Sequence, residues 1–213
     1  MKESLSYFLY TFTSLITVVN PFSAMPFYRI LTENQTSEVS KSIAKRASIA
    51  AFLAMILFAL FGKFIFSFFN VSVDGLRVVG SVLFFIMGYD MLQGKESRTE
   101  AVSELEASHI HDIKIQAITP LAIPLITGPG TITFMTVRMH ESVTFHDRAL
   151  LLASALLVSI STFYILLSSR KIMAIIGISG QKVFVRMMGL ILMMIAVEYF
   201  FTGLHPYIKA LNS

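Results

Sequence analysis

The sequence predicts an all-α integral membrane protein whose six transmembrane helices form a 3+3 inverted repeat. Three observations predict it: an apolar composition, six long apolar segments, and similar motifs in the two halves. Of the 213 residues, 55% are hydrophobic and 14% are charged, and the mean hydropathy of +0.72 is far above that of soluble proteins. The net charge of +4 comes from residues scattered at the ends of apolar runs. We therefore expect membrane topology, and no nucleic-acid partner, to explain it.

Six apolar segments are about long enough to cross ~30 Å of hydrocarbon as helices. Their residue ranges are 5–30, 47–69, 76–92, 115–137, 149–168 and 183–202. The first segment lacks a small-residue cleavage site, so we interpret it as a retained span and not as a signal peptide. The only sizeable polar stretch, "QGKESRTEAVSELEASHIHDIK", separates the third and fourth segments.

The polar stretch defines the domain organisation. We predict a first three-helix membrane repeat over residues 1–94, a polar cytoplasmic linker over residues 95–114, and a second three-helix repeat over residues 115–213. Because each repeat has an odd number of spans, the second repeat must enter the membrane from the opposite side. Inverted repeats of this kind are typical of secondary transporters.

Four pairs of short motifs support the repeat, in the same order in both halves and at a nearly constant offset. Asn20-Pro21 matches Thr119-Pro120, and Arg46-Ala47 matches Arg148-Ala149. Val71-Ser72 matches Ile178-Ser179, and Arg77-x-x-Gly80 matches Arg186-x-x-Gly189. The offset grows slowly along the chain, as small loop insertions would make it do. Chance similarity between apolar segments is the alternative, but four ordered pairs favour duplication.

The distribution of lysine and arginine predicts the orientation. One side of the membrane receives eleven of them: Arg29, Lys41, Lys45, Arg46, Lys95, Arg98, Lys114, Arg170, Lys171, Lys182 and Arg186. The other side receives six: Lys2, Lys63, Arg77, Arg138, Arg148 and Lys209. Positive residues favour the cytoplasm, so we expect both termini to lie outside it.

Helix-breaking residues concentrate at two corresponding places. The stretch "NPFSAMPF" (residues 20–27) should interrupt the first span, and "TPLAIPLITGPG" (residues 119–130) the fourth. Proline removes a backbone donor and clashes with the preceding turn, so each break frees backbone N–H and C=O groups. Such groups are tolerated at membrane depth only where they are buried in protein or line a wet cavity. Simple kinks between packed helices are the alternative to a binding site.

The residues of the two breaks also resemble a known family. "NPFSAMPFY" and "PLAIPLITGPGTIT" look like the signature stretches of the MarC family of six-span bacterial membrane proteins, and the resemblance extends over nearly the whole chain. Similar members of that family, of the SnatA type, transport small neutral amino acids. The resemblance thus implies a substrate such as glycine or alanine, bound between the broken first and fourth helices, in the bacterial inner (cytoplasmic) membrane.

The predicted substrate site consists of residues from both breaks. Freed N–H groups at a half-helix start attract a carboxylate, and freed carbonyls attract an ammonium group, so backbone alone could hold an amino acid. We expect glycine's conformational freedom to be needed in the turn of the second break, where valine would then abolish transport. The candidate substrate-binding residues are Asn20, Pro21, Ser23, Ala24, Thr119, Pro120, Thr127, Gly128, Pro129 and Gly130.

The remaining polar residues suggest no further chemistry. Arg77 and Arg186 lie about one turn inside their spans, so we expect them to reach the interface. The histidines of "HIH" (His109 and His111) have no third metal ligand nearby, and no catalytic motif is present, so we expect neither a metal site nor an enzyme. We expect no cofactor. Proton or sodium coupling, a homo-oligomer among the membrane lipids, and a non-transport structural or regulatory subunit all stay compatible with the sequence.

Overall fold

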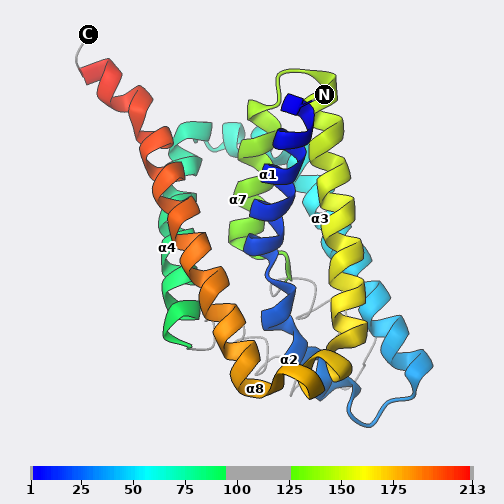
Figure 1. Cartoon of the computed structure of the whole chain (residues 1–213). Helices are drawn as coiled ribbons and strands as arrows, with labels where there is room; N and C mark the ends of the chain where they lie inside the picture. The colour runs from blue at the N-terminus through cyan, green and yellow to red at the C-terminus, as the bar shows by residue number, and fades with distance from the viewer. Residues whose placement is uncertain (1, 95–125, 212–213) are drawn as a thin grey trace.

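The computed structural model describes residues 2–94 and 126–211, and every regular element among them is an α-helix. Helix α1 (Lys2–Val19) descends from the end where the N-terminus lies, and α2 (Pro21–Thr32) continues downward after a bend of 42° (Figure 1). Helix α3 (Ser37–Phe68) returns, and α4 (Val73–Gln93) descends again. Helix α7 (Pro129–Glu141) rises from the middle of the bundle, and α8 (Phe145–Leu211) descends and then returns.

Four described helical segments are long and apolar enough to cross a membrane: Ser37–Phe68, Val73–Gln93, Phe145–Gly177 and Ser179–Leu211. The α1–α2 pair adds a fifth if it is counted as one bent span. Helix α7 has 13 residues, so it extends only about 20 Å and cannot cross alone. Residues 115–125 of the predicted fourth span lie outside the described residues.

Helix α3 starts well before the predicted second span, because Thr36 caps it. The Thr36 side chain accepts a hydrogen bond from the backbone N–H of Val39. The polar first turns of α3 therefore stay helical outside the apolar run. The third predicted span, residues 76–92, is confirmed, since α4 covers Val73–Gln93.

The helices that contain the fifth and sixth predicted spans extend well beyond residues 149–168 and 183–202. Helix α8 continues through residues 169–182, and only Gly177 departs from helical geometry, with φ 65° and ψ 176°. A positive φ is strained for residues with a Cβ atom, so glycine allows this sharp turn within a single residue. The two halves of α8 therefore meet directly (Figure 1).

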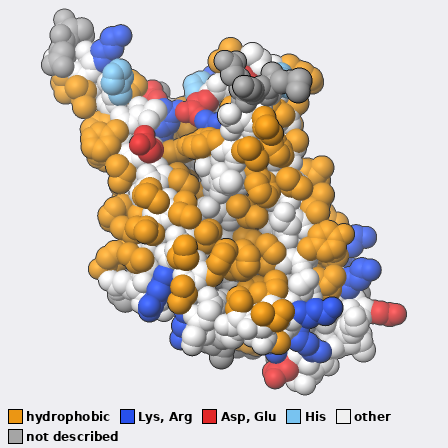
Figure 2. Space-filling model, in the orientation of Figure 1, with side chains coloured by type: hydrophobic (Ala, Val, Ile, Leu, Met, Phe, Trp, Pro, Cys, Tyr) orange, Lys and Arg blue, Asp and Glu red, His pale blue; other side chains and the backbone are white. Residues whose placement is uncertain are grey.

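Large apolar side chains cover the outside of the bundle, where a soluble protein would be polar. Leu53, Phe64, Val79, Tyr164 and Phe201 are each at least 59% exposed. Figure 2 shows these apolar surfaces as a broad band, with lysine and arginine gathered at the lower end. A bilayer stabilises such a surface, whereas water does not.

Candidate functional site

The first predicted break is present, but it involves one residue. Asn20 has the left-handed backbone angles φ 42° and ψ 67°, and the chain bends by 42° there between α1 and α2. Asparagine is one of the few non-glycine residues that tolerate this conformation. Pro21 fits as the first residue of α2, because that position needs no N–H donor.

The predicted interruption through Pro26 is wrong, because α2 runs through that proline to Thr32. Proline at position 26 cannot donate to the carbonyl of Phe22, four residues earlier. The side-chain amide of Gln181, from the second half of α8, donates to this carbonyl instead, at 3.0 Å. The rings of Phe22 and Phe184 add a contact beside it, with centroids 4.3 Å apart. The Phe22 carbonyl is therefore already paired within the protein.

Asn20 itself carries an unsatisfied group. Its side chain is buried, and its amide nitrogen donates to the Ser23 hydroxyl at 2.5 Å and points to Met91 Sδ of α4 at 3.8 Å. Its oxygen Oδ1 is buried and has no hydrogen-bond partner within residues 2–94 and 126–211. An unpaired buried acceptor is costly, so Asn20 is suited to receive a donor from a ligand.

The second break begins a half-helix of the same kind. Gly128 precedes α7 with φ −74° and ψ 179°, and Pro129 is its first residue. Helices α2 and α7 have 12 and 13 residues, and each begins with a proline. The spacing from Pro21 to Pro129 equals the spacing from the start of α3 at Ser37 to the start of α8 at Phe145. Two successive helix starts therefore repeat at one common offset.

This spacing between helix starts differs from the register that the sequence predicts for the two halves. It pairs Asn20-Pro21 with Gly128-Pro129, whereas the sequence paired it with Thr119-Pro120, which lies outside the described residues. Arg46 and Arg148 do not correspond either, since they lie at different distances from the starts of α3 and α8. The pair Arg77 and Arg186 nearly keeps the new spacing.

The conformational argument for glycine in the second break is wrong. The φ of Gly128 is negative, and Gly130 lies within α7. Packing instead favours glycine at position 130: a Cβ atom there would lie 3.1 Å from Cε1 of Phe84 and 3.3 Å from Sδ of Met87, both on α4, so these side chains would have to shift slightly. Thr127, just before the break, is buried, and its hydroxyl donates to the carbonyl of Ala51 on α3 at 3.5 Å.

Helix α4 brings the two breaks together. Asn20 contacts Met91, and Gly130 packs against Met87, one turn earlier on the same helix. The two methionines lie about 6 Å apart along the helix axis. Of the other predicted site residues, Pro21 and Ala24 are buried in α2, and Ser23 contacts Asn20.

A buried ion-pair network at the end of α7 was missed by the sequence analysis. Arg77 of α4 is buried within the bundle, and its guanidinium pairs with Glu141. Arg138 donates to the other oxygen of Glu141 at 2.7 Å. The spacing of Arg138 and Glu141 on one helix could have suggested their pair, but nothing local connects Glu141 to Arg77.

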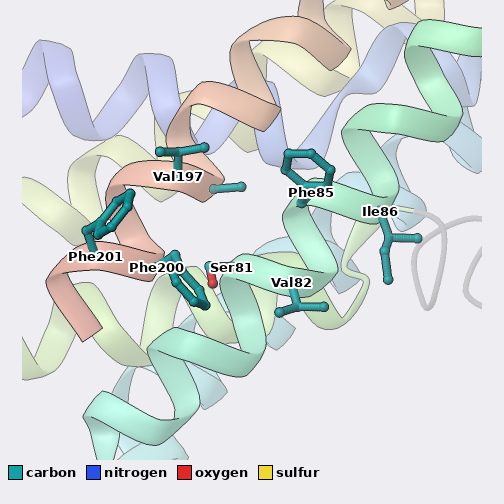
Figure 3. Close-up of a pocket in the computed structure, with 8 residues that line it drawn as sticks. Ser81, Val82, Phe85, Ile86, Val197, Phe200 and Phe201 are labelled. Carbon is teal, nitrogen blue, oxygen red and sulfur yellow. The ribbon is translucent and has the colours of Figure 1, made fainter. Parts of the chain in front are cut away.

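Two hollows in the described surface lie away from the breaks. One, of about 280 Å³, lies between α4 and α8 and is lined by apolar side chains and by Ser81 (Figure 3). The Ser81 hydroxyl already donates to the carbonyl of Val78, so this groove offers little to a polar ligand. The other, of about 260 Å³, includes Arg29, Glu33 and Arg170 at the end of the bundle opposite the termini. No cluster of three metal-ligating side chains occurs among the described residues.

The apolar surface, the long helices and the paired half-helices define a multi-pass integral membrane protein. The chain belongs to the MarC family of integral membrane proteins, whose sequence profile matches residues 5–208.

Named relatives cover nearly the whole chain. A UPF0056 membrane protein of Methanocaldococcus jannaschii is 36% identical over 94% of this chain and 97% of its own length. The UPF0056 membrane protein YvbG of Bacillus subtilis is 34% identical over 98% of this chain and 99% of its own. No solved structure matches the chain significantly.

Proposed function

We propose that this protein is a secondary transporter of small neutral amino acids, such as glycine or alanine, that binds its substrate between the two breaks. The observation that carries the proposal is the buried Asn20 Oδ1, which lacks a donor within the described residues and lies at the bend between α1 and α2. A substrate ammonium group would supply that donor. Buried acceptors of this kind are rare unless a ligand or water satisfies them.

The start of α7 supplies a partial positive charge for the substrate carboxylate. Pro129 has no N–H, so the first free donors of α7 are the backbone N–H groups of Gly130 and Thr131. A helix N-terminus attracts anions, and a substrate carboxylate fits this role. Both breaks lie beside α4, within about one helical turn of each other. Such a separation suits a molecule the size of glycine or alanine.

The fold is compatible with alternating access. Helices α2 and α7 both start inside the bundle and run in opposite directions (Figure 1). The common offset between the helix starts supports an inverted repeat with discontinuous first and fourth spans. In transporters of this architecture, one repeat rocks against the other around the site. The lysines and arginines at the lower end in Figure 2 favour a cytoplasmic position for that end and an external position for both termini.

Reconstitution tests the proposal. The purified protein in liposomes should exchange external labelled glycine or alanine for unlabelled internal amino acid, and it should exclude large or charged amino acids. Imposed proton and sodium gradients would identify the coupling ion. A protein that is folded in the liposomes but moves neither amino acid above empty liposomes would favour a structural or regulatory role and overturn the proposal.

A further inference from the structure

The last turn of α7 is fastened to two other helices. Three charged residues form what we call the clasp: Arg77 of α4, and Arg138 and Glu141 of α7. The Glu141 carboxylate receives Arg77 on one oxygen and Arg138 on the other. The guanidinium of Arg138 also lies over the rings of Tyr7 and Tyr10 of α1, 4.9 and 5.2 Å from their centroids. The clasp thus ties α7 to α4 and α1.

The two arginines of the clasp are largely buried, unlike the arginines of a surface ion pair, and Glu141 is partly buried. The side chains of Arg77 and Arg138 are 9% and 13% exposed, and that of Glu141 is 30% exposed. Removing one partner of a buried pair leaves uncompensated charge, which is strongly unfavourable. Glu141 therefore holds α7 against α4, because it is the one carboxylate in the described residues that bridges both arginines.

The network has more donors than acceptors. Arg77 Nε, Arg138 Nε and the Tyr199 hydroxyl are buried without a hydrogen-bond partner in the part of the chain that the structure describes. Asp74 lies 3.9 Å from Arg77, but it belongs to the same helix, and its side chain is 41% exposed. Asp74 therefore does not connect α4 to another helix. These unpaired donors can bind another acceptor, such as water, when Glu141 moves away from an arginine.

Between the clasp and the breaks, α7 packs closely against α3 and α4. A Cβ atom at Gly62 of α3 would overlap the side chain of Thr136, and one at Gly80 of α4 would overlap that of Thr133. Thr131 and Thr133 are 1% and 3% exposed. Helix α7 is therefore packed tightly against α3 and α4 between the breaks and the clasp.

We propose that the clasp is the releasable lock on this side of the transporter, and that Glu141 must leave at least one arginine before the site can open toward the termini. This role rests on the proposed function, since alternating access requires each side to close in turn. Helix α7 is suited to the movement because one of its ends lies at the break and the other at the clasp.

Cysteine accessibility tests the lock without measuring transport. The chain has no cysteine, so a single reporter can be placed at Ser14, which is 4% exposed on α1. Ser14 lies about one turn from Thr11, whose hydroxyl accepts a hydrogen bond from Arg138. Sealed vesicles with the termini outward would be treated with an impermeant maleimide. We expect Glu141→Gln to raise the labelling rate of Ser14→Cys about tenfold, the change that about 1.4 kcal/mol produces.

The matched control is Asp74→Asn, which removes the other acidic neighbour of Arg77 and should leave the rate unchanged. A second reporter at Ser48 of α3, 5% exposed and away from the clasp, detects general unfolding. Faster labelling at Ser14 alone supports the lock. An unchanged rate in Glu141→Gln, an equal increase in Asp74→Asn, or faster labelling at both reporters would overturn it. If Glu141→Gln speeds labelling at Ser14 as expected but the parent protein moves no amino acid in liposomes, the proposed function would be contradicted and the lock would not.

Discussion

Gln181 of α8 donates a hydrogen bond of 3.0 Å to the backbone carbonyl of Phe22, the carbonyl that Pro26 leaves without a helical partner. The two residues are 159 positions apart, so this bond attaches the second half of α8 to the start of α2. The bond satisfies the carbonyl that Pro26 leaves free, and α2 is continuous at the point where the sequence suggested an unwound segment.

Replacing Gln181 with leucine should destabilise the protein, because it leaves the Phe22 carbonyl unpaired. We expect a loss of about 1–3 kcal/mol, measured as a lower apparent Tm in detergent. In the background Pro26→Ala, residue 26 regains an N–H that can pair with Phe22. Gln181→Leu should then have a smaller effect. An equal loss in both backgrounds would contradict this pairing.

Replacing Asn20 with glycine separates its backbone role from its side-chain role. Glycine accepts the left-handed conformation, so folding should be retained, while the unpaired oxygen is lost. We expect the affinity for glycine or alanine to fall about tenfold or more, as for a hydrogen bond to a charged group. Binding can be measured by competition in the liposome exchange assay.

The matched control for Asn20 is Asn70→Gly. Asn70 also has a left-handed backbone, with φ 55°, but it is exposed at the end of α3. This substitution should leave exchange unchanged. Equal transport by Asn20→Gly and the parent protein would remove Asn20 from the site.

Replacing Gly130 with valine should abolish exchange without preventing membrane insertion. The reason is packing: the first side-chain carbon would already lie 3.1 Å from Phe84, and the two further carbons of valine would push the start of α7 away from α4. Gly130→Ala should be milder, and Phe84→Leu should partly restore it by making room. No rescue by Phe84→Leu would indicate that Gly130 acts in another way.

Two asparagines at opposite ends of α3 test the orientation. Asn34 lies in the turn before α3, and Asn70 lies in the turn after it; both are exposed. In intact cells, an impermeant thiol reagent should label Asn70→Cys and leave Asn34→Cys unlabelled until the membrane is permeabilised. The reverse pattern would place the termini in the cytoplasm.

Much of the helical architecture could be predicted from short stretches of sequence, because apolar runs and prolines determine the conformation of the residues next to them. The third span and the bend at Asn20-Pro21 follow from such signals. The extent of the first break could not be predicted, since the sequence does not reveal that Gln181 compensates for Pro26. Likewise, Gly130 was selected for the wrong reason, because its contact with Phe84 exists only in the folded chain.

By itself, the sequence determined that this chain enters a membrane as helices and that two proline-containing stretches begin new helical segments. Composition, hydropathy and the missing proline N–H are properties of the local chain, so they need no partner. Only the tertiary structure decided that α4 carries both breaks on neighbouring turns, and that Arg77 is buried against Glu141. Those contacts join residues far apart in the chain, and the burial that makes a charge or an unpaired oxygen significant arises only when the helices pack.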